Sequence, residues 1–522
     1  MNPERVEFDI SELLHAAAFP HPTGAIALRE THISWVILTG PYAYKIKKPV
    51  KADFIDATTL ELRHFYCEEE LRLNGRLAPE IYLDVVAITR VNGQPTIGGT
   101  GPAVEYAVRM RQFPPEVELP ALLAAHAVSV TDIASLSALL AGFHLSLRPA
   151  AWNGSFDGTA KMLETVFGNL GQLNADLERA GSVAHLGRLI DWTGHTAEAL
   201  EGTFQQRERT GFIRECHGDL HAANIVRIAG RLIPFDCIEF DPGLRWIDVI
   251  NDVAFLFMDL VSRDRPDLAF TLLSRYLETT GDYEGVRVLP FYAVYRALVR
   301  AKVDAYAAVQ MPARAAEFQQ RLQQRLRTAA RLTDPPQPSL FIMHGVSGSG
   351  KSWMSERLVP ALAALRIRSD LERKRMTGAL GRSAQSEVGQ GIYTSNLSHR
   401  VYARLADSAE ICLRAGCSVI VDAAFLQAAD RELFQGMAAR LRTRFLIVAC
   451  EAGMEELAAR IADRAQVGQD PSDATSAVLA EQLKNLAAFS RQEQPHVVRV
   501  RTVDGDAVPS VVGRVDRVAH DI

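Results

Sequence analysis

The chain has 522 residues, of which 48% are hydrophobic and 23% are charged, and its formal net charge at pH 7 is −5. This length is too great for a single hydrophobic core, so two or three domains are expected. The net charge gives no reason to expect a general nucleic-acid binder, although it does not exclude a local basic groove.

The cysteines and the N-terminus narrow the class of protein further. None of the six cysteines forms a CxxC pair, which argues against a zinc site and against a disulfide framework. The sequence has no signal-peptide pattern and no uninterrupted apolar run of ~18 residues. We therefore expect a cytoplasmic protein without a membrane span.

The chain up to about residue 115 is predicted to be rich in β-strands. Alternation along the second strand places Lys45 and Lys47 on one face, where a lysine needs an anion unless it only protects a sheet edge. Glu69 and Glu70, on the helix that follows, are candidate partners, with a solvated face as the alternative. The predicted elements are a short helix at 5–19, strands within 31–50, a helix at 58–77 capped by Thr58, and strands at 81–90 and 102–111.

Helices are predicted next, interrupted by a polar stretch and a β-hairpin. His217 to Asn224 hold an Asp, two His and an Asn, and the hairpin that follows ends on Asp236. Such a hairpin can hold a base opposite metal ligands on rigid elements. Acidic residues nearby can receive a cationic acceptor, with capping and bracing of the next helix by Asp248 and Asp252 as the alternative. The predicted helices span 120–148, 158–208 and 244–330, the hairpin strands 225–228 and 232–235, and the acidic residues are Glu239, Asp241, Asp248 and Asp252.

A proline-rich stretch at 333–339 is the predicted linker between two domains, 1–332 and 340–522. In the first domain, a β-rich lobe and a helical lobe would leave a ligand cleft between them. In the second, strands alternate with helices, which is the pattern of a parallel sheet. The predicted strands are 339–345, 366–370, 417–424 and 444–452, and helices begin at Lys351, Ser395, Ala429 and Glu455.

The segment from Gly345 to Ser352 satisfies the pattern GxxxxGK[ST] between an apolar strand and a helix. Its glycines let main-chain N–H groups surround phosphates, and the helix N-terminus adds positive charge. Lys351 would reach the β- and γ-phosphates of ATP, and Ser352 would coordinate Mg²⁺. The residues expected to form this phosphate site are Gly345, Ser347, Gly348, Ser349, Gly350, Lys351 and Ser352.

Further charged residues belong with this loop. Asp370 and Asp422 end predicted strands, where ligands bind in open α/β sheets, so Asp370 is expected at an acceptor hydroxyl and Asp422 at the metal, with helix capping as the alternative. Arg460 and Arg464 lie four apart on a helix and can close over a transferred phosphoryl group, or pair with nearby acids at the surface. The polar stretch 466–475 suits a lid.

Residues ~30–330 resemble the aminoglycoside phosphotransferase-like branch of the protein-kinase-like fold, whose HGDxHxxN motif stands here as His217–Asn224. The resemblance implies that Asp219 is the base or positioner for an acceptor hydroxyl and that Asn224 and Asp236 hold Mg²⁺. His217 and His221 are expected to brace the loop through hydrogen bonds. It also implies a phosphate lysine at Lys45 or Lys47, its helix partner at Glu70 or Glu69, and a hinge, Met110–Phe113, that binds adenine. Only Thr39–Pro41 stands where the family has a glycine loop.

Residues ~338–500 resemble the small P-loop kinases, a group that includes gluconate kinase, polynucleotide kinase and zeta-toxin-like members. The whole order resembles fused bacterial proteins described as bifunctional aminoglycoside phosphotransferase/ATP-binding proteins. The implied fold class is an α+β protein-kinase-like bilobal domain followed by an α/β P-loop domain with a mostly parallel sheet.

The predicted function is a tandem ATP- and Mg²⁺-dependent phosphotransferase, each domain acting on a hydroxyl of a small sugar or aminoglycoside-like acceptor. One alternative is that the P-loop half acts on a nucleic-acid 5′-hydroxyl or a nucleotide sugar. Basic residues near Asp370 would then hold phosphates. The other alternative is that one half of the chain is a non-catalytic ATP-binding regulator. The basic residues near Asp370 that would serve the first alternative are Arg366, Arg368, Arg373, Lys374 and Arg375.

Overall fold

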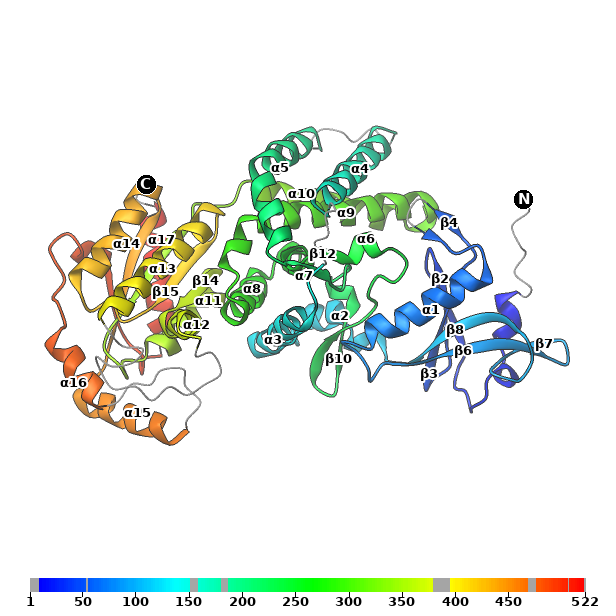
Figure 1. Cartoon of the computed structure of the whole chain (residues 1–522), viewed down its shortest axis with the longest axis horizontal. Coiled ribbons are helices and arrows are strands. Elements are labelled where there is room, and N and C mark those ends of the chain that lie inside the picture. Colours follow the sequence, from blue (N-terminus) through cyan, green and yellow to red (C-terminus); the bar gives the residue numbers. More distant parts are fainter. Residues whose placement is uncertain are drawn as a thin grey trace. The chain divides into compact units, whose positions relative to one another are not determined.

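The computed structural model describes residues 9–52, 55–150, 158–179, 186–378, 395–467, 476–505 and 507–520 (Figure 1). Within its helices, the side chains of 178–179, 395–396, 464–467, 476–477 and 516–520 are not described. The chain forms two compact units: unit 1 comprises 1–165 and 205–256, and unit 2 comprises 166–204 and 257–522. The predicted linker at 333–339 lies inside unit 2, and the domain limits remain a prediction.

Unit 1 begins with a six-stranded antiparallel sheet in the order β1-β2-β3-β8-β6-β7. In β3, Tyr44 and Ile46 pack into the core on one face, whereas Ala43 packs into the core on the other. The strands of this sheet are β1 (Ala27–Glu30), β2 (Ser34–Leu38), β3 (Tyr42–Lys47), β6 (Tyr82–Val91), β7 (Gln94–Ile97) and β8 (Ala103–Arg111). Between β3 and β6 in the chain, β4 (Lys51–Ala52) and β5 (Ile55–Asp56) form a separate two-stranded sheet. The sequence did not predict β1 and β7, which are four-residue strands at the two edges of the sheet.

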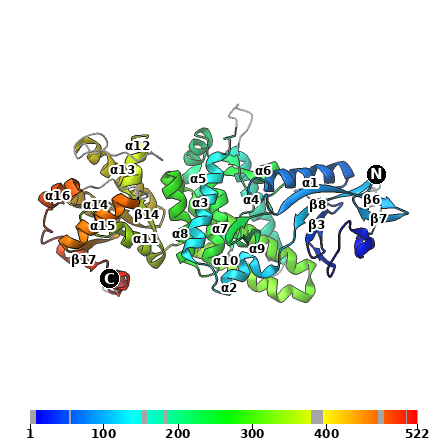
Figure 2. The same cartoon turned by 90° about the horizontal axis from the view of Figure 1, so that it is seen from below.

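Helix α1 (Leu60–Asn74) lies along one face of this sheet (Figures 1 and 2). Its Cys67 belongs to the same buried hydrophobic cluster as Ala43 and Val108 of the sheet. The N-cap is Thr59 rather than the predicted Thr58.

Where the sequence predicted one helix at 5–19, the described residues form two 3₁₀ turns, η1 (Ile10–Leu13) and η2 (Ala16–Ala18). Leu13 and Ala18 are both fully buried in the core of the same sheet. On one continuous α-helix, two residues five positions apart would point about 140° away from each other. The break between the turns lets both side chains reach the sheet.

The rest of unit 1 carries the polar stretch and the predicted hairpin, which is present. Strands β10 and β11 pair antiparallel, with Ala229 and Gly230 at positive φ in the turn, as a tight hairpin turn of this twist requires. The elements are η3 (Pro115–Val117), α2 (Leu119–Ala124), α3 (Val130–Ser146), β9 (Ile213–Glu215), η4 (Ala222–Asn224), β10 (Ile225–Ile228), β11 (Arg231–Pro234), α6 (Pro242–Arg245) and β12 (Trp246–Asp248). Helices α4 (Gly158–Arg179), α5 (Leu186–Arg209) and α7 (Val249–Ser262) each contribute to both units.

Unit 2 is built on a five-stranded, all-parallel sheet in the order β14-β15-β13-β16-β17. Every residue of the central strand β13 is buried, which explains its continuous apolar run. The strands are β13 (Ser339–His344), β14 (Ala364–Arg368), β15 (Ser418–Asp422), β16 (Arg444–Glu451) and β17 (Val497–Arg501). The helices around them are α11 (Lys351–Leu362), α12 (Ser369–Met376), α13 (Ser395–Arg414), α14 (Ala428–Leu441), α15 (Met454–Val467), α16 (Ser476–Lys484), η8 (Gln494–His496) and α17 (Ala507–His520).

Unit 2 also contains the helices that precede the proline-rich stretch. Helix α8 packs against the edge strand β14 and against α11 (Figure 1). These preceding elements are α8 (Pro266–Thr280), η5 (Tyr283–Arg287), α9 (Leu289–Gln310), η6 (Pro312–Arg314) and α10 (Ala315–Thr333). None of the described helices is long and apolar enough to cross a membrane.

Candidate active sites

A buried ion cluster lies between strand β3 and helix α1 in unit 1. Lys45 Nζ donates to Glu70 Oε1 at 2.8 Å, and Lys47 Nζ donates to Glu70 Oε2 at 2.5 Å. Burial alone would raise the pKa of Glu70, but the charges of the two lysines outweigh burial and hold this pKa well below its usual value. The neighbouring Glu69 instead pairs with Arg72 and Arg245. Of the two glutamates left open by the sequence, Glu70 is the one that meets the strand lysines.

The loop after the hairpin brings two more carboxylates to this cluster. Asp236 Oδ1 accepts a hydrogen bond from Lys45 Nζ at 2.5 Å, and Glu239 pairs with Lys47. Lys45 therefore contacts Asp236, the predicted metal ligand, while Lys47 is completely buried between Glu70 and Glu239. The sequence did not single out Glu239 for this pair, because the two residues are 192 positions apart.

Asp236 has a left-handed backbone, with φ of 65°, which is uncommon for a residue other than glycine. Its N–H donates to the Tyr82 hydroxyl at 3.1 Å, which helps to hold this conformation. Backbone outliers of this kind cluster at functional sites, where the surrounding fold maintains them. The conformation thus sets the direction of the Asp236 carboxylate toward Lys45.

The predicted catalytic loop is tied together by its own side chains. Asn224 Nδ2 donates to Asp219 Oδ2 at 2.9 Å and to the Asp219 carbonyl at 3.0 Å. His221 Nε2 lies 3.3 Å from Asp219 Oδ2. Because the amide nitrogen of Asn224 is engaged with Asp219, its Oδ1 is the atom suited to a metal ion.

His217 braces the loop on the other side. Its Nε2 donates to the Phe235 carbonyl at 2.9 Å, and its Nδ1 accepts from the Asp219 N–H at 3.3 Å. This pattern needs a neutral ring, and burial lowers the pKa of His217 accordingly. The bracing hydrogen bonds expected for this histidine are therefore present.

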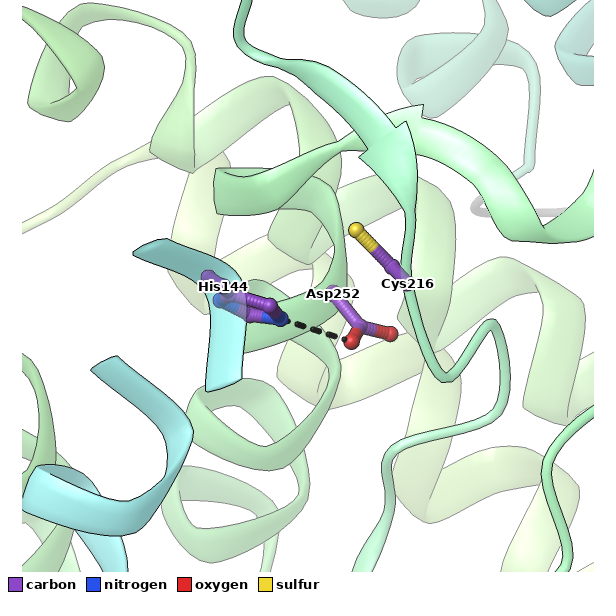
Figure 3. A group of neighbouring side chains, drawn as sticks. All are labelled: His144, Cys216 and Asp252. Atoms are coloured by element: carbon purple, nitrogen blue, oxygen red, sulfur yellow. Dashed lines mark hydrogen bonds and ion pairs between the residues drawn. The ribbon is translucent and has the colours of Figure 1, made fainter. Parts of the chain in front are cut away.

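Asp252, in α7, binds the main chain of the same loop through both of its carboxylate oxygens. It accepts the N–H groups of His217 at 3.0 Å and Gly218 at 2.9 Å, and His144 Nε2 lies 3.1 Å from its Oδ2 (Figure 3). Burial alone would raise the pKa of Asp252. The hydrogen bond and the charge of His144, together with the hydrogen bond from the His217 N–H, outweigh burial and lower this pKa.

His144, Cys216 and Asp252 form a buried group whose potential ligand atoms lie within 4.8 Å of one another (Figure 3). The hydrogen bonds of Asp252 and the contact of the Cys216 thiol with the Ile247 carbonyl, at 3.6 Å, account for this group as a brace of the loop. Burial raises the pKa of the Cys216 thiol well above its ordinary value, which disfavours the thiolate that a metal would require.

The acidic residues considered for a cationic acceptor are engaged in the fold. Asp248 forms a buried, bidentate pair with Arg207, with contacts of 2.6 and 2.9 Å. Asp241 caps α6 by accepting the Gly243 N–H at 2.7 Å. Asp248 also accepts the Ile250 N–H in the first turn of α7 at 2.8 Å, so it braces the next helix as the alternative expected, whereas Asp252 holds the loop that contains His217 and Gly218.

Met110, in the predicted adenine hinge, is buried in a core cluster that joins Val108 of the sheet to Val226 and Ile233 of the hairpin. In the hinge itself, the Arg111 N–H donates to the Ile81 carbonyl and the Gln112 N–H to the Pro41 carbonyl. Any adenine bound here must therefore use other main-chain groups of the segment.

The P-loop of unit 2 lies between the central strand β13 and helix α11, as its sequence predicts. Gly345, Gly348 and Gly350 have φ of 145°, 84° and 90°, conformations that side chains rarely adopt. A Cβ on Gly350 would lie 2.4 Å from Thr502 Oγ1, and one on Gly345 would lie 2.6 Å from the Cys450 carbonyl. The buried hydroxyl of Ser349 has no hydrogen-bond partner among the described residues. Such a loop of main-chain groups suits phosphate oxygens.

The charged residues expected beside the P-loop gather at the ends of neighbouring strands. Lys351 Nζ donates to the Val346 carbonyl at 2.9 Å, and Asp422 accepts from Ser355 Oγ at 2.9 Å. Asp370 follows β14, which pairs with β15, the strand that ends on Asp422. Burial, reinforced by the charge of Asp422, raises the pKa of Asp370. Hydroxyl and carboxylate oxygens, such as those of Ser352 and Asp422, are the type of ligand that a hard cation such as Mg²⁺ prefers.

Arg460 reaches the P-loop from α15. Its Nη1 donates to the Gly348 carbonyl at 3.0 Å and to Thr502 Oγ1 at 3.1 Å, and it also pairs with Glu456. Ser347 N–H donates to Gln482 Oε1 at 2.7 Å, a contact that the sequence did not suggest. The side chain of Arg464 and most of the proposed lid, 468–475, lie outside the described residues.

The basic residues around Asp370 are largely committed to protein partners. Arg366 is only 2% exposed and forms a bidentate pair with Glu278. Arg375 pairs with Glu372, and Arg373 Nη1 lies 3.4 Å from Ser398 Oγ. For Arg366, the suggestion that it holds ligand phosphates is wrong, because the guanidinium is buried and bound at two nitrogens by the Glu278 carboxylate.

Residues 340–489 match the family model described as an AAA domain. Over 456 residues, the chain is 29% identical to uncharacterised proteins of Mycobacterium bovis and Mycobacterium tuberculosis, a match that covers 87% of this chain and 89% of each relative.

Two solved structures are also similar to parts of this chain. A choline/ethanolamine kinase family protein from Mesorhizobium loti is 13% identical with a TM-score of 0.37, and the match covers 62% of this chain and 93% of that one. A gluconokinase from Sinorhizobium meliloti is 19% identical with a TM-score of 0.27, and the match covers 35% of this chain and 95% of that one. The predicted fold class is confirmed: an α+β region with an antiparallel sheet is followed by an α/β P-loop region whose sheet is parallel.

Proposed function

We propose that the chain is a tandem phosphotransferase with two sites, each of which transfers the γ-phosphoryl group of ATP to a hydroxyl of a small polar acceptor. One observation, made in both units, carries the proposal: each unit has a lysine accompanied by a side-chain oxygen of the kind that Mg²⁺ prefers. In unit 1 the lysine is Lys45 beside Asp236. In unit 2 it is Lys351, next to Ser352 in the P-loop.

In the first site, Asp219 orients the acceptor hydroxyl and accepts its proton, because a carboxylate held by Asn224 and His221 has a fixed direction. Asn224 Oδ1 and Asp236 are the residues that would hold Mg²⁺, which when bound neutralises charge on the transferred phosphoryl group. Lys45, fixed by Glu70, binds the other phosphates. Positioning and charge neutralisation supply the catalysis, since phosphoryl transfer needs little covalent help from the protein.

In the second site, the main-chain N–H groups of the P-loop and Lys351 bind the phosphates of ATP. Ser352 and Asp422 are the residues that would hold Mg²⁺. Asp370 receives the acceptor hydroxyl, and its raised pKa brings it closer to neutral pH, where a general base is most effective. Arg460, already placed over the loop, neutralises charge that develops during transfer.

The experiment is phosphorylation of a metabolite extract by the full chain with isotopically labelled ATP, followed by mass spectrometry. The parent protein is compared with Asp219→Asn and Lys351→Ala, each of which disables one site. We expect at least one labelled phosphoester that disappears in only one of the two variants. Such a product assigns its acceptor to one site, and its structure gives the acceptor class.

Two results would contradict the proposal. If neither variant alters ATP consumption or any labelled product, the chain is not a phosphotransferase at these sites. If label passes from ATP to the 5′-end of an oligonucleotide in a reaction that depends on Lys351, the acceptor of the second site is a nucleic acid. Strong weakening of that transfer by salt would support this reading.

A further inference from the structure

A buried ion pair links helix α8 to the edge strand of the P-loop sheet, inside unit 2. Arg366 Nε donates to Glu278 Oε1 at 2.6 Å, and its Nη2 donates to Glu278 Oε2 at 3.0 Å. Arg366 is 2% exposed and Glu278 is 6% exposed. A planar guanidinium bound at both oxygens has a fixed orientation, so Glu278 determines where the third nitrogen of Arg366 points.

That third nitrogen points toward the phosphate and metal residues. Arg366 Nη1 donates to Ser355 Oγ at 3.2 Å and lies 3.3 Å from the Ser352 carbonyl. Ser355 Oγ in turn donates to Asp422 Oδ2 at 2.9 Å. The chain of contacts thus starts on α8 and ends on Ser352 and Asp422, the two residues proposed to hold Mg²⁺.

Helix α8 and the η5 turn also fix the strand that carries Arg366. The Arg366 N–H donates to Ser274 Oγ at 3.0 Å, and the Tyr283 hydroxyl donates to the Arg366 carbonyl at 3.3 Å. Arg375 donates to the Glu278 carbonyl. The Ser274 and Tyr283 side chains satisfy main-chain groups on the open edge of β14, where a further strand would otherwise bind. The position of Arg366 therefore depends on α8 through both its main chain and its side chain.

We propose that Glu278 is a positioning residue of the P-loop site. It fixes Arg366, which sets Ser355 against Asp422 and holds the first turn of α11 through the Ser352 carbonyl. This inference rests on the proposed binding of Mg·ATP in the P-loop. It means that the P-loop half needs a helix that precedes the proline-rich stretch at 333–339 to arrange its metal ligands.

The test measures binding of a fluorescent ATP analogue to the full chain as Mg²⁺ is titrated. All variants carry Asp236→Ala, which removes a proposed metal ligand from the first site. Glu278→Gln and Ser355→Ala interrupt the contacts at two points and are each expected to raise the Mg²⁺ concentration for half-maximal binding about tenfold, a typical effect of residues that support metal ligands. The matched control is Glu356→Gln, which removes the more exposed pair between Arg275 of α8 and α11. It is expected to leave the Mg²⁺ dependence within about twofold of the parent value.

Thermal unfolding measured in parallel separates positioning from general stabilisation. If Glu278→Gln and Ser355→Ala lower the melting temperature but leave the Mg²⁺ dependence at the parent value, the inference is overturned. If Glu278→Gln does not fold, Ser355→Ala decides the outcome alone, because it cuts the same contacts inside the P-loop region. Lys351→Ala identifies the binding site. If that variant binds the analogue as well as the parent does, the proposed function of the P-loop fails, independently of Glu278.

Discussion

Lys45 and Lys351 are proposed to do the same work, but the fold positions them in opposite ways. The partners of Lys45 are Glu70 and Asp236, which lie 25 and 191 positions away in the sequence. Lys351, by contrast, donates to the Val346 carbonyl, five positions away in the same loop. The first site is assembled by tertiary structure from ionised side chains, whereas the second is largely the main chain of one loop. The first should therefore be sensitive to charge changes and the second to changes in backbone shape.

The largest expected effect tests whether the two sites are separate. Lys45→Met and Lys351→Met should each lower kcat/KM for the product of their own site about 10³-fold, since each removes the cation that binds the phosphates. Each should leave the product of the other site within about twofold of the parent rate. Steady-state kinetics on two identified acceptors checks this. Loss of both products in either single variant would show that the two lysines serve one reaction.

Charge removal in unit 1 should have the next largest effect. Lys47→Met leaves Glu70 and Glu239 without one buried cation and should lower the free energy of unfolding by about 3 to 5 kcal/mol. The double variant Lys47→Met, Glu239→Gln should recover part of this loss, because it also removes a buried negative charge.

Chemical denaturation followed by circular dichroism measures these changes. The control is Lys51→Met, which breaks an exposed pair with Asp56 and should leave the free energy of unfolding unchanged. Equal effects of Lys47→Met and Lys51→Met would contradict the idea that burial makes the first cluster sensitive to charge.

His344, at the end of β13, gives unit 2 a predicted pH dependence. Burial, together with the charges of Arg431 and Lys351, lowers the pKa of His344 to about 4 from an ordinary value of 6.5. Between these values the unfolded chain binds a proton that the folded chain does not, so stability falls as pH drops from 6.5 toward 4. The loss should reach about 2 to 3 kcal/mol at the lower limit.

Denaturation of His344→Phe across this pH range should show a smaller decline than the parent protein. His195→Gln, at an exposed position on α5, is the control and should keep the decline of the parent. A decline of the same size in His344→Phe would assign the pH dependence to other groups.

A single methyl group tests backbone shape in the P-loop. Gly350→Ala places a Cβ 2.4 Å from Thr502 Oγ1 at a φ of 90°, and should cost unit 2 about 2 kcal/mol while weakening ATP binding. Gly436→Ala is the matched control, because nothing lies within 4 Å of its Cβ and it sits in helix α14. That change should be neutral or slightly stabilising. Similar losses in both variants would contradict a requirement for the loop conformation.

The sequence by itself determined the features that depend on neighbouring residues. The alternation of strands β13 to β16 with helices α11, α13, α14 and α15, the P-loop between β13 and α11, and the hairpin that ends on Asp236 all follow from local patterns. Glycine, proline and apolar periodicity restrict the backbone over a few residues, so consecutive letters are enough to predict them. The strands β1, β7 and β17 were missed, because they lie at sheet edges and bury fewer side chains, which leaves little of such a pattern.

Only the tertiary structure decided which charged groups meet. The sequence left Glu69 and Glu70 as equal candidates, since adjacent helix residues differ only in the direction that packing gives them. In one alternative it placed Arg366 among residues that hold ligand phosphates, whereas the fold pairs this residue with Glu278, 88 positions earlier. A buried ion pair depends on which surfaces of distant elements come together, and no local preference encodes that choice. The positions of both proposed sites were thus readable from the sequence, but the partners that orient their residues were not.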